Sequence, residues 1–192
     1  MVISDKIDEL LKKDLMGIGS TKRNPEKVQM LKEQHQKIQK YFEGKSVKVK
    51  LLLNTGFNTA GDIILEGDNI VIDDKDILNI FLDGTAYINF YVEDNRLRVQ
   101  LAHADLITEE KKFERQSSTE IMSKEELADA IRQWSGESKK VLEFGDDYAI
   151  YDEECTICHN SLFWYIISEV AGIKITKLSN QRVRIEFSVG NQ

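Results

Sequence analysis

The amino-acid sequence predicts an α+β protein, and three patterns along the 192 residues carry that prediction. Over residues 1–45 the apolar residues recur every three or four positions, which is the period of a helix. From Ser46 the period falls to two, in short runs separated by Gly, Asn and Asp, which is typical of antiparallel strands. From Ser123 helical and extended patterns alternate again. We therefore predict a helical segment over 1–45, a small β-barrel or sandwich domain over 46–108, a linker or long loop over 109–122 and a C-terminal α+β unit over 123–192.

Two helices are predicted in the first segment. Residues 4–16 form the first, which ends at the glycines that follow. Asn24-Pro25 begins the second, because Asn can accept hydrogen bonds from the first free N–H groups and Pro lacks the N–H that would be unsatisfied there. Its apolar residues, from Val28 to Phe42, follow a heptad spacing. At under three heptads, we expect this stripe to pack on its own domain and not in an intermolecular coiled coil.

Six strands are predicted in the second segment, over residues 47–53, 62–65, 69–72, 77–82, 85–92 and 97–102. The last two are joined by a turn at Glu93-Asp94-Asn95. The polar tract that follows marks the predicted boundary at 109–122.

The C-terminal unit begins with a capping box, Ser123-Lys124-Glu125-Glu126, which predicts a helix to Trp134. Residues 139–151 are extended, with a turn after Gly145. A nearly all-apolar helix over 162–171 is expected to be buried, and two strands over 173–178 and 182–189 end the chain. No internal repeat is visible in the sequence.

Composition excludes several classes of protein. The longest apolar run, Leu162–Ile167, is far shorter than the ~18 residues that a membrane span needs. The N-terminus lacks the pattern of an export signal, and two cysteines are too few for a disulfide scaffold. We therefore expect a cytoplasmic protein with no membrane partner.

The charge distribution predicts the kind of partner. The net charge is −7, and the negative charge lies beyond the net-positive first 45 residues. A negative body repels nucleic-acid phosphates, so we expect a protein partner with a basic surface, with homo-oligomerisation as a further option. The candidate contacts are acidic residues in two groups: Asp68, Asp73, Asp74, Asp76 and Asp83, and Asp146, Asp147, Asp152, Glu153 and Glu154. The second group could alternatively hold Mg²⁺.

Cys155, Cys158 and His159 form a Cys-x-x-Cys-His pattern. It offers three of the four ligands of a Zn²⁺ site, and the same spacing occurs in redox pairs and at haem attachment sites. We expect the cysteines to be buried as small apolar side chains. A zinc site completed by a carboxylate or by a second chain, and a redox pair, remain open as alternatives, and no other cofactor is expected.

Residues 47–91 resemble the Sm-like fold of the Sm, LSm and Hfq proteins. The predicted strand 47–53 precedes Gly56 and Gly61, which have the spacing of the family's loop glycines, and Asp68 opens the next strand. Leu82-Asp83-Gly84 is similar to the second family signature, with Asp83 at the usual basic position. The resemblance implies a five-stranded barrel, a ring-shaped oligomer and binding of single-stranded, uracil-rich RNA.

No P-loop, Gly-x-Ser-x-Gly or Gly-x-Gly-x-x-Gly motif is present. We therefore expect a non-enzymatic, acidic binding protein that acts through protein–protein contacts, as an inhibitor or accessory factor of a phage or other mobile element. The alternatives are an Sm-like nucleic-acid-binding oligomer, and a metal-dependent or redox protein built on the Cys-x-x-Cys-His pattern.

Overall fold

The computed structural model describes residues 25–53, 59–82, 85–104, 122–138, 140–152, 155–158 and 161–190. They form four α-helices and two five-stranded antiparallel sheets, which confirms the α+β prediction. The first sheet has the order β1-β2-β5-β4-β8 and the second β3-β9-β10-β7-β6. The helices are α2 (Pro25–Tyr41), α3 (Lys75–Leu82), α4 (Lys124–Glu137) and α5 (Ser161–Glu169). The strands are β1 (Lys48–Leu53), β2 (Thr59–Gly67), β3 (Asn69–Ile72), β4 (Thr85–Glu93), β5 (Arg96–Ala104), β6 (Val141–Phe144), β7 (Tyr148–Tyr151), β8 (Cys155–Cys158), β9 (Gly172–Lys177) and β10 (Val183–Ser188), with a short 3-10 turn, η1 (Ser179–Gln181), between the last two.

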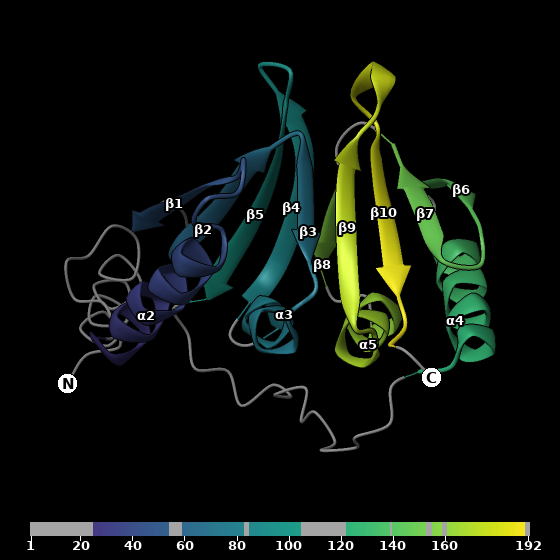
Figure 1. The fold of residues 1–192 in the computed structure, drawn as a ribbon, viewed down its shortest axis with the longest axis horizontal. Helices are drawn as coiled ribbons and strands as arrows, with labels where there is room; N and C mark the ends of the chain where they lie inside the picture. Colours follow the sequence, from purple (N-terminus) through teal and green to yellow (C-terminus); the bar gives the residue numbers. More distant parts are fainter. Residues whose placement is uncertain are drawn as a thin grey trace, which may run out of the picture.

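The same order of elements occurs twice. One helix, three strands, a second helix and two strands run from α2 to β5, and the order repeats from α4 to β10. The sheets match as well, because β1-β2-β5-β4 in the first corresponds to β6-β7-β10-β9 in the second. In each repeat the third strand is exchanged: β3 completes the second sheet and β8 completes the first. Figure 1 shows the two sheets side by side, with α3 and α5 near the centre.

The central strands show the repeat in sequence. Arg96-Leu97-Arg98-Val99-Gln100-Leu101 in β5 corresponds to Arg182-Val183-Arg184-Ile185-Glu186-Phe187 at β10. Leu97 and Val183 hold the same place, because each is the first residue of its strand to pair with the equivalent inner neighbour: Leu97 lies opposite Gly67 on β2, and Val183 lies opposite Tyr151 on β7. Two arginines and the apolar alternation are retained over these six positions. A match this short and degenerate is invisible without the register, which explains why the sequence shows no repeat.

One continuous core lies between the helices and the sheets. The buried positions of α3 are Ile77, Leu78, Ile80 and Phe81, and those of α5 have the same spacing: Phe163, Trp164, Ile166 and Ile167. Leu31, Ile38 and Phe42 are buried where α2 packs on β1 and β2, so the heptad stripe packs on its own domain as predicted. The predicted capping box of α4 is also present.

Residues 77–82 are a helix and not the strand that was predicted. The Asp74 carboxylate accepts hydrogen bonds from the backbone N–H groups of Asp76 (2.8 Å) and Ile77 (3.3 Å), and so caps the first turn of α3. Ile77, Leu78, Ile80 and Phe81 then lie on one helical face, a pattern that a short apolar run does not separate from a strand. Among the described residues neither sheet closes into a barrel, and α3 interrupts the stretch that resembles the Sm-like fold.

The exchanged strands connect the predicted domain over 46–108 with the predicted unit over 123–192. Residues 46–108 supply β3 to the second sheet, and residues 123–192 supply β8 to the first. The predicted helix over 4–16 and residues 109–121 of the predicted linker lie outside the described residues. No helix in the described ranges combines the length and apolarity that crossing a membrane requires.

Candidate functional site

One end of the second sheet gathers acidic residues from both predicted groups. Asp73, Asp74 and Asp76 follow the end of β3, and Asp146 and Asp147 precede the start of β7. These strand ends lie at the same end of the sheet, because β3 is antiparallel to β9, β9 to β10 and β10 to β7. Three strand spacings, about 14 Å, separate the two sets. We call these five residues the acidic end.

Hydrogen bonds fix part of the backbone and the side chains of Asp73 and Asp74 at the acidic end. The Tyr41 hydroxyl donates to Asp73 Oδ1 (2.6 Å), and the Phe187 N–H donates to the Asp147 carbonyl (2.7 Å). The Tyr41 hydrogen bond, more than the nearby charge of Lys45, lowers the pKa of the Asp73 carboxyl. Burial, and then the hydrogen bond to Asp73, raises the pKa of Tyr41 to about 12. Asp73 therefore stays a charged carboxylate, and its hydrogen bond with Tyr41 joins the end of β3 to the end of α2.

The carboxylates of the acidic end have little counter-charge. Within the described residues, no lysine or arginine forms an ion pair with any of the five. Lys75 lies between Asp74 and Asp76 in sequence, but its ammonium donates to the Ser168 (2.8 Å) and Val170 (2.6 Å) carbonyls at the end of α5. All five acidic residues are exposed. The end of this sheet is therefore an exposed patch of net negative charge, with the charge of Lys45 acting on Asp73 but without an ion pair among the described residues.

The other predicted contact residues do not join this patch. Asp68 lies at the opposite end of the second sheet, where its carboxylate pairs with Lys177 (3.4 Å). Asp152 follows β7 and lies at that same opposite end. Asp83, Glu153 and Glu154 lie outside the described residues. The structure thus brings together five of the ten residues, which sequence order had divided into two groups.

The Cys-x-x-Cys-His pattern belongs to the exchanged strand β8. Its Cα positions pair with β4, Cys155 opposite Phe90 and Cys158 opposite Tyr87. The cysteine side chains and His159 lie outside the described residues, and no group of three or more His, Cys, Asp or Glu suited to a metal occurs within them. Three residues of extended strand set two Cα atoms about 10 Å apart, and a disulfide needs less than about 7 Å. A redox pair here would therefore require β8 to bend.

A second charged cluster was missed by sequence reasoning. The Glu66 carboxylate is 6% exposed and pairs with Lys50 (3.0 Å), Arg96 (3.0 Å) and Arg98 (3.5 Å). Its hydrogen bond with Lys50, aided by Arg96, lowers the pKa of Glu66 against the opposing effect of burial. Arg98 also pairs with Glu93. These five residues come from four strands, β1, β2, β4 and β5, so only the strand register could have revealed the cluster.

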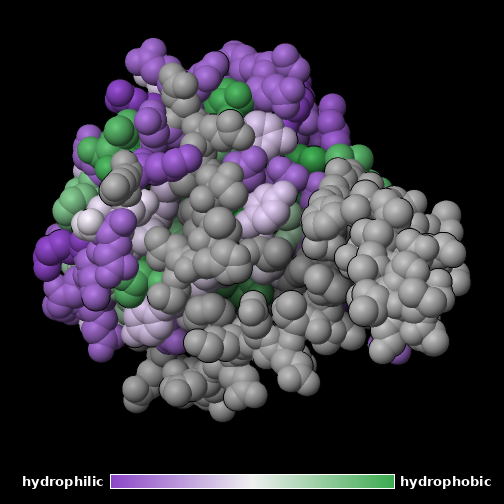
Figure 2. Space-filling view, turned by 180° about the vertical axis from the view of Figure 1, so that it is seen from behind, coloured by the Kyte–Doolittle hydropathy of each residue, from purple (hydrophilic) through white to green (hydrophobic). Residues whose placement is uncertain are grey.

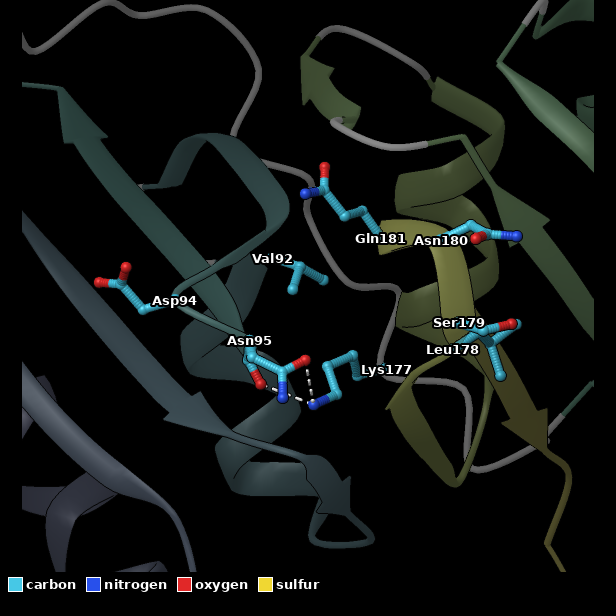
Figure 3. Close-up of a pocket in the computed structure, with 8 residues that line it drawn as sticks. All are labelled: Val92, Asp94, Asn95, Lys177, Leu178, Ser179, Asn180 and Gln181. Carbon is cyan, nitrogen blue, oxygen red and sulfur yellow. Dashed lines mark hydrogen bonds between the residues drawn. The ribbon is translucent and has the colours of Figure 1, made fainter.

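A pocket of about 270 Å³ lies between the tips of the two equivalent hairpins, β4–β5 and β9–β10 (Figure 3). The Lys177 ammonium crosses it, donating to the backbone carbonyl (2.6 Å) and the side-chain oxygen (3.2 Å) of Asn95. The two pairs of turn residues there have left-handed backbone conformations, with φ between 52° and 62°: Asp94 and Asn95, and Asn180 and Gln181. The turn at Glu93-Asp94-Asn95 was predicted from sequence, but its proximity to the β9–β10 turn was not. The hydrogen bonds of Lys177 join the β9–β10 hairpin to the β4–β5 hairpin, so we interpret this pocket as part of the interface between the two repeats.

The surface seen from behind is hydrophilic over much of its described area, with single hydrophobic groups scattered in it (Figure 2).

No protein-family model matches this chain, and no curated protein matches it either. The function therefore has to be argued from the geometry of the described residues.

Proposed function

We propose that this protein is a non-enzymatic binding protein whose acidic end contacts a basic surface of a partner protein. The observation that carries the proposal is the meeting of two acidic segments, about 70 residues apart in sequence, at one end of a hydrogen-bonded sheet without ion-pairing cations among the described residues. Charge that is not neutralised within the molecule remains available to a partner.

The geometry supports recognition by charge more than by shape. The acidic end sets two groups of exposed aspartates about 14 Å apart on one hydrogen-bonded strand array, which suits a basic surface of at least that width. Such charges mainly accelerate association and exclude acidic partners. A partner that binds nucleic acid would present a basic surface of this kind, so we propose occlusion of such a surface as the form of inhibition.

The test compares three forms of the protein in affinity capture from a nuclease-treated lysate of the source cells. In Asp76→Lys/Asp146→Lys the charge of the acidic end is reversed at two side chains for which the described residues record no hydrogen bond. Glu125→Lys/Asp129→Lys makes the same change of charge on the exposed face of α4. We expect a basic protein to be captured by the wild type and the α4 control. Its affinity for the acidic-end variant should fall at least about tenfold, chiefly through slower association.

The nucleic-acid alternative predicts the opposite result. Reversing Asp76 and Asp146 removes repulsion of phosphate, so a protein that binds RNA would bind more tightly in the acidic-end variant. Fluorescence anisotropy with a labelled, single-stranded uracil-rich RNA measures this directly. Binding of that RNA by the wild type, strengthened in the variant, would reject the proposed function.

A further inference from the structure

The two outermost strands, β1 and β6, occupy equivalent places in the two repeats. Within the described residues each pairs on one side only, β1 with β2 and β6 with β7. Figure 1 places them at opposite ends of the molecule. The free side of an edge strand presents backbone N–H and C=O groups that can pair with another chain.

Exposed apolar side chains concentrate on these two strands. Leu52 and Leu53 on β1 are 42% and 38% exposed, and Leu142 and Phe144 on β6 are 47% and 46% exposed. They make up four of the six large apolar side chains that are exposed in the described part of the chain. Large apolar side chains beside an unpaired strand edge favour the addition of a further strand.

The two edge strands themselves carry opposite charge. On β1, Lys48 and Lys50 are exposed, and Lys50 also pairs with Glu66. Strand β6 carries Glu143, which accepts a hydrogen bond from the Tyr148 hydroxyl, and it lies between Lys140 and Asp146 in sequence. Like charges placed opposite each other on adjacent strands are destabilising, and opposite charges are stabilising. A β1–β1 pair would therefore bring lysines together, whereas a β1–β6 pair can place Lys50 opposite Glu143.

We propose that β6 of one molecule pairs antiparallel with β1 of a second copy of this chain, joining the second sheet of one molecule to the first sheet of the next. With Lys50 opposite Glu143, Val49 falls opposite Phe144 and Leu51 opposite Leu142. Val49 and Leu51 pack against the core, and Phe144 has buried Ala149 as its partner on β7, so Val49 and Phe144 continue one apolar face. Leu142 lies at the irregularity of β6 between Val141 and Glu143. The register thus satisfies charge at Lys50 and Glu143 and face at Val49 and Phe144.

The form of the assembly follows from the junction. Two different edges meet, so the contact is heterologous and repeats into a ring or an open chain. A junction of about five residues a side buries less than the roughly 1,200 Å² of a stable complex. We therefore expect weak association, which becomes measurable only as the protein concentration rises. The inference is independent of the proposed function, because it uses the edges of the sheets and not the acidic end.

Sedimentation velocity from low to high micromolar concentration tests the junction. We expect the average sedimentation coefficient of the wild type to rise with concentration. Phe144→Asp should weaken association at least about tenfold, because it places an unpaired charge in the apolar row. Val71→Asp is the matched control, since Val71 is equally exposed (42%) but lies on β3. This variant should associate like the wild type.

Charge exchange gives a second, independent test. Lys50→Glu and Glu143→Lys should each weaken association several-fold on their own, because each sets like charges together. The double variant, and an equimolar mixture of the two single variants, should restore it. Circular dichroism checks that each variant folds, because Lys50 also pairs with Glu66. Three results would overturn the proposal: a wild type that stays monomeric at every concentration, equal effects of Phe144→Asp and Val71→Asp, or a double variant whose association stays weak. A monomeric wild type that binds an unrelated extended peptide would show that the edge serves another partner.

Discussion

The two repeats share one order of elements but contribute different side chains to the common core. In the first repeat, Ile77 and Leu78 of α3 and Leu101 of β5 are aliphatic. The equivalent residues of the second repeat are Phe163, Trp164 and Phe187. Trp134 of α4 completes an aromatic group there, with its ring 5.3 Å from the rings of both Tyr151 and Phe163. The same backbone therefore tolerates two core chemistries, provided the pattern of burial is kept.

The polar faces differ in the same way. Glu66, paired with Arg98 across β2 and β5, is equivalent to Ile150, paired with Arg184 across β7 and β10. In the first sheet the arginine joins a buried carboxylate. In the second sheet Arg184 stacks on the Tyr148 ring at 4.0 Å and lies 3.6 Å from Glu186. Among the described residues, the comparison indicates that carboxylates are buried in the first sheet, whereas exposed carboxylates gather at the end of the second.

The largest predicted effect concerns the aromatic core. Trp134→Ala should destabilise the fold by about 4 kcal/mol, because it removes the largest fully buried side chain and leaves a cavity. Ile38→Ala, at an equally buried position of the corresponding helix α2, should cost about 3 kcal/mol. Trp134→Phe should recover part of the loss, since the buried indole N–H has no hydrogen-bond partner in the described residues. Urea unfolding measures all three free energies, and a loss below about 1 kcal/mol for Trp134→Ala would show that the second repeat does not depend on this cluster.

The two equivalent arginines should differ in their contributions to stability. Arg98→Ala removes a cation from Glu66 and from Glu93, and should cost about 2 kcal/mol because the Glu66 carboxylate is buried. Arg184→Ala removes one cation–π contact and one long ion pair, and should cost about 1 kcal/mol or less. Thermal unfolding of the two variants at low and moderate salt gives the comparison. Equal losses would mean that burial of Glu66 adds nothing to its ion pairs.

The pH dependence of stability should distinguish the sheets further. The pKa of Glu66 in the folded protein lies below its usual value of 4.5, so the charged carboxylate stabilises the fold above that pH. This contribution is lost as the pH falls through the folded-state pKa. Glu66→Gln should therefore be less stable than the wild type at pH 7, and the gap should shrink below about pH 4.5. Glu186→Gln, in the second sheet, serves as the control in urea unfolding across this range; a constant gap for Glu66→Gln would contradict the assignment.

Much of this fold was predictable because its signals are local. The capping box at Ser123 and Glu126, the turn at Glu93-Asp94-Asn95 and nearly every strand follow from neighbouring residues. Helix α3 was missed because its cap, Asp74, precedes a run of eight residues that fits either period. The exchanged strands, the Glu66 cluster and the acidic end depend on which strands pair, and no short stretch of sequence encodes that. The five residues of the acidic end are half of the predicted contact residues. That they lie at one end of the second sheet follows only from the pairing of β3, β9, β10 and β7.

The smallest predicted effect is a gain in stability at a point where the two outer helices differ. Gly136 follows Trp134 by two residues in α4, where α2 has Lys40 two residues after Ile38. A Cβ added at Gly136 would meet nothing within 4 Å, so Gly136→Ala should stabilise the protein by up to about 1 kcal/mol through the lower conformational entropy of the unfolded chain. Gly172→Ala should have the opposite sign, because its Cβ would lie 2.9 Å from the Ile72 carbonyl of the exchanged strand β3. Differential scanning calorimetry of Gly136→Ala and Gly172→Ala measures the change in Tm of each variant and shows whether Gly136 weakens α4 or is required there. A higher Tm confirms that the glycine is a local weakness of α4, and a lower Tm would mean that the end of α4 needs the freedom of glycine to reach β6.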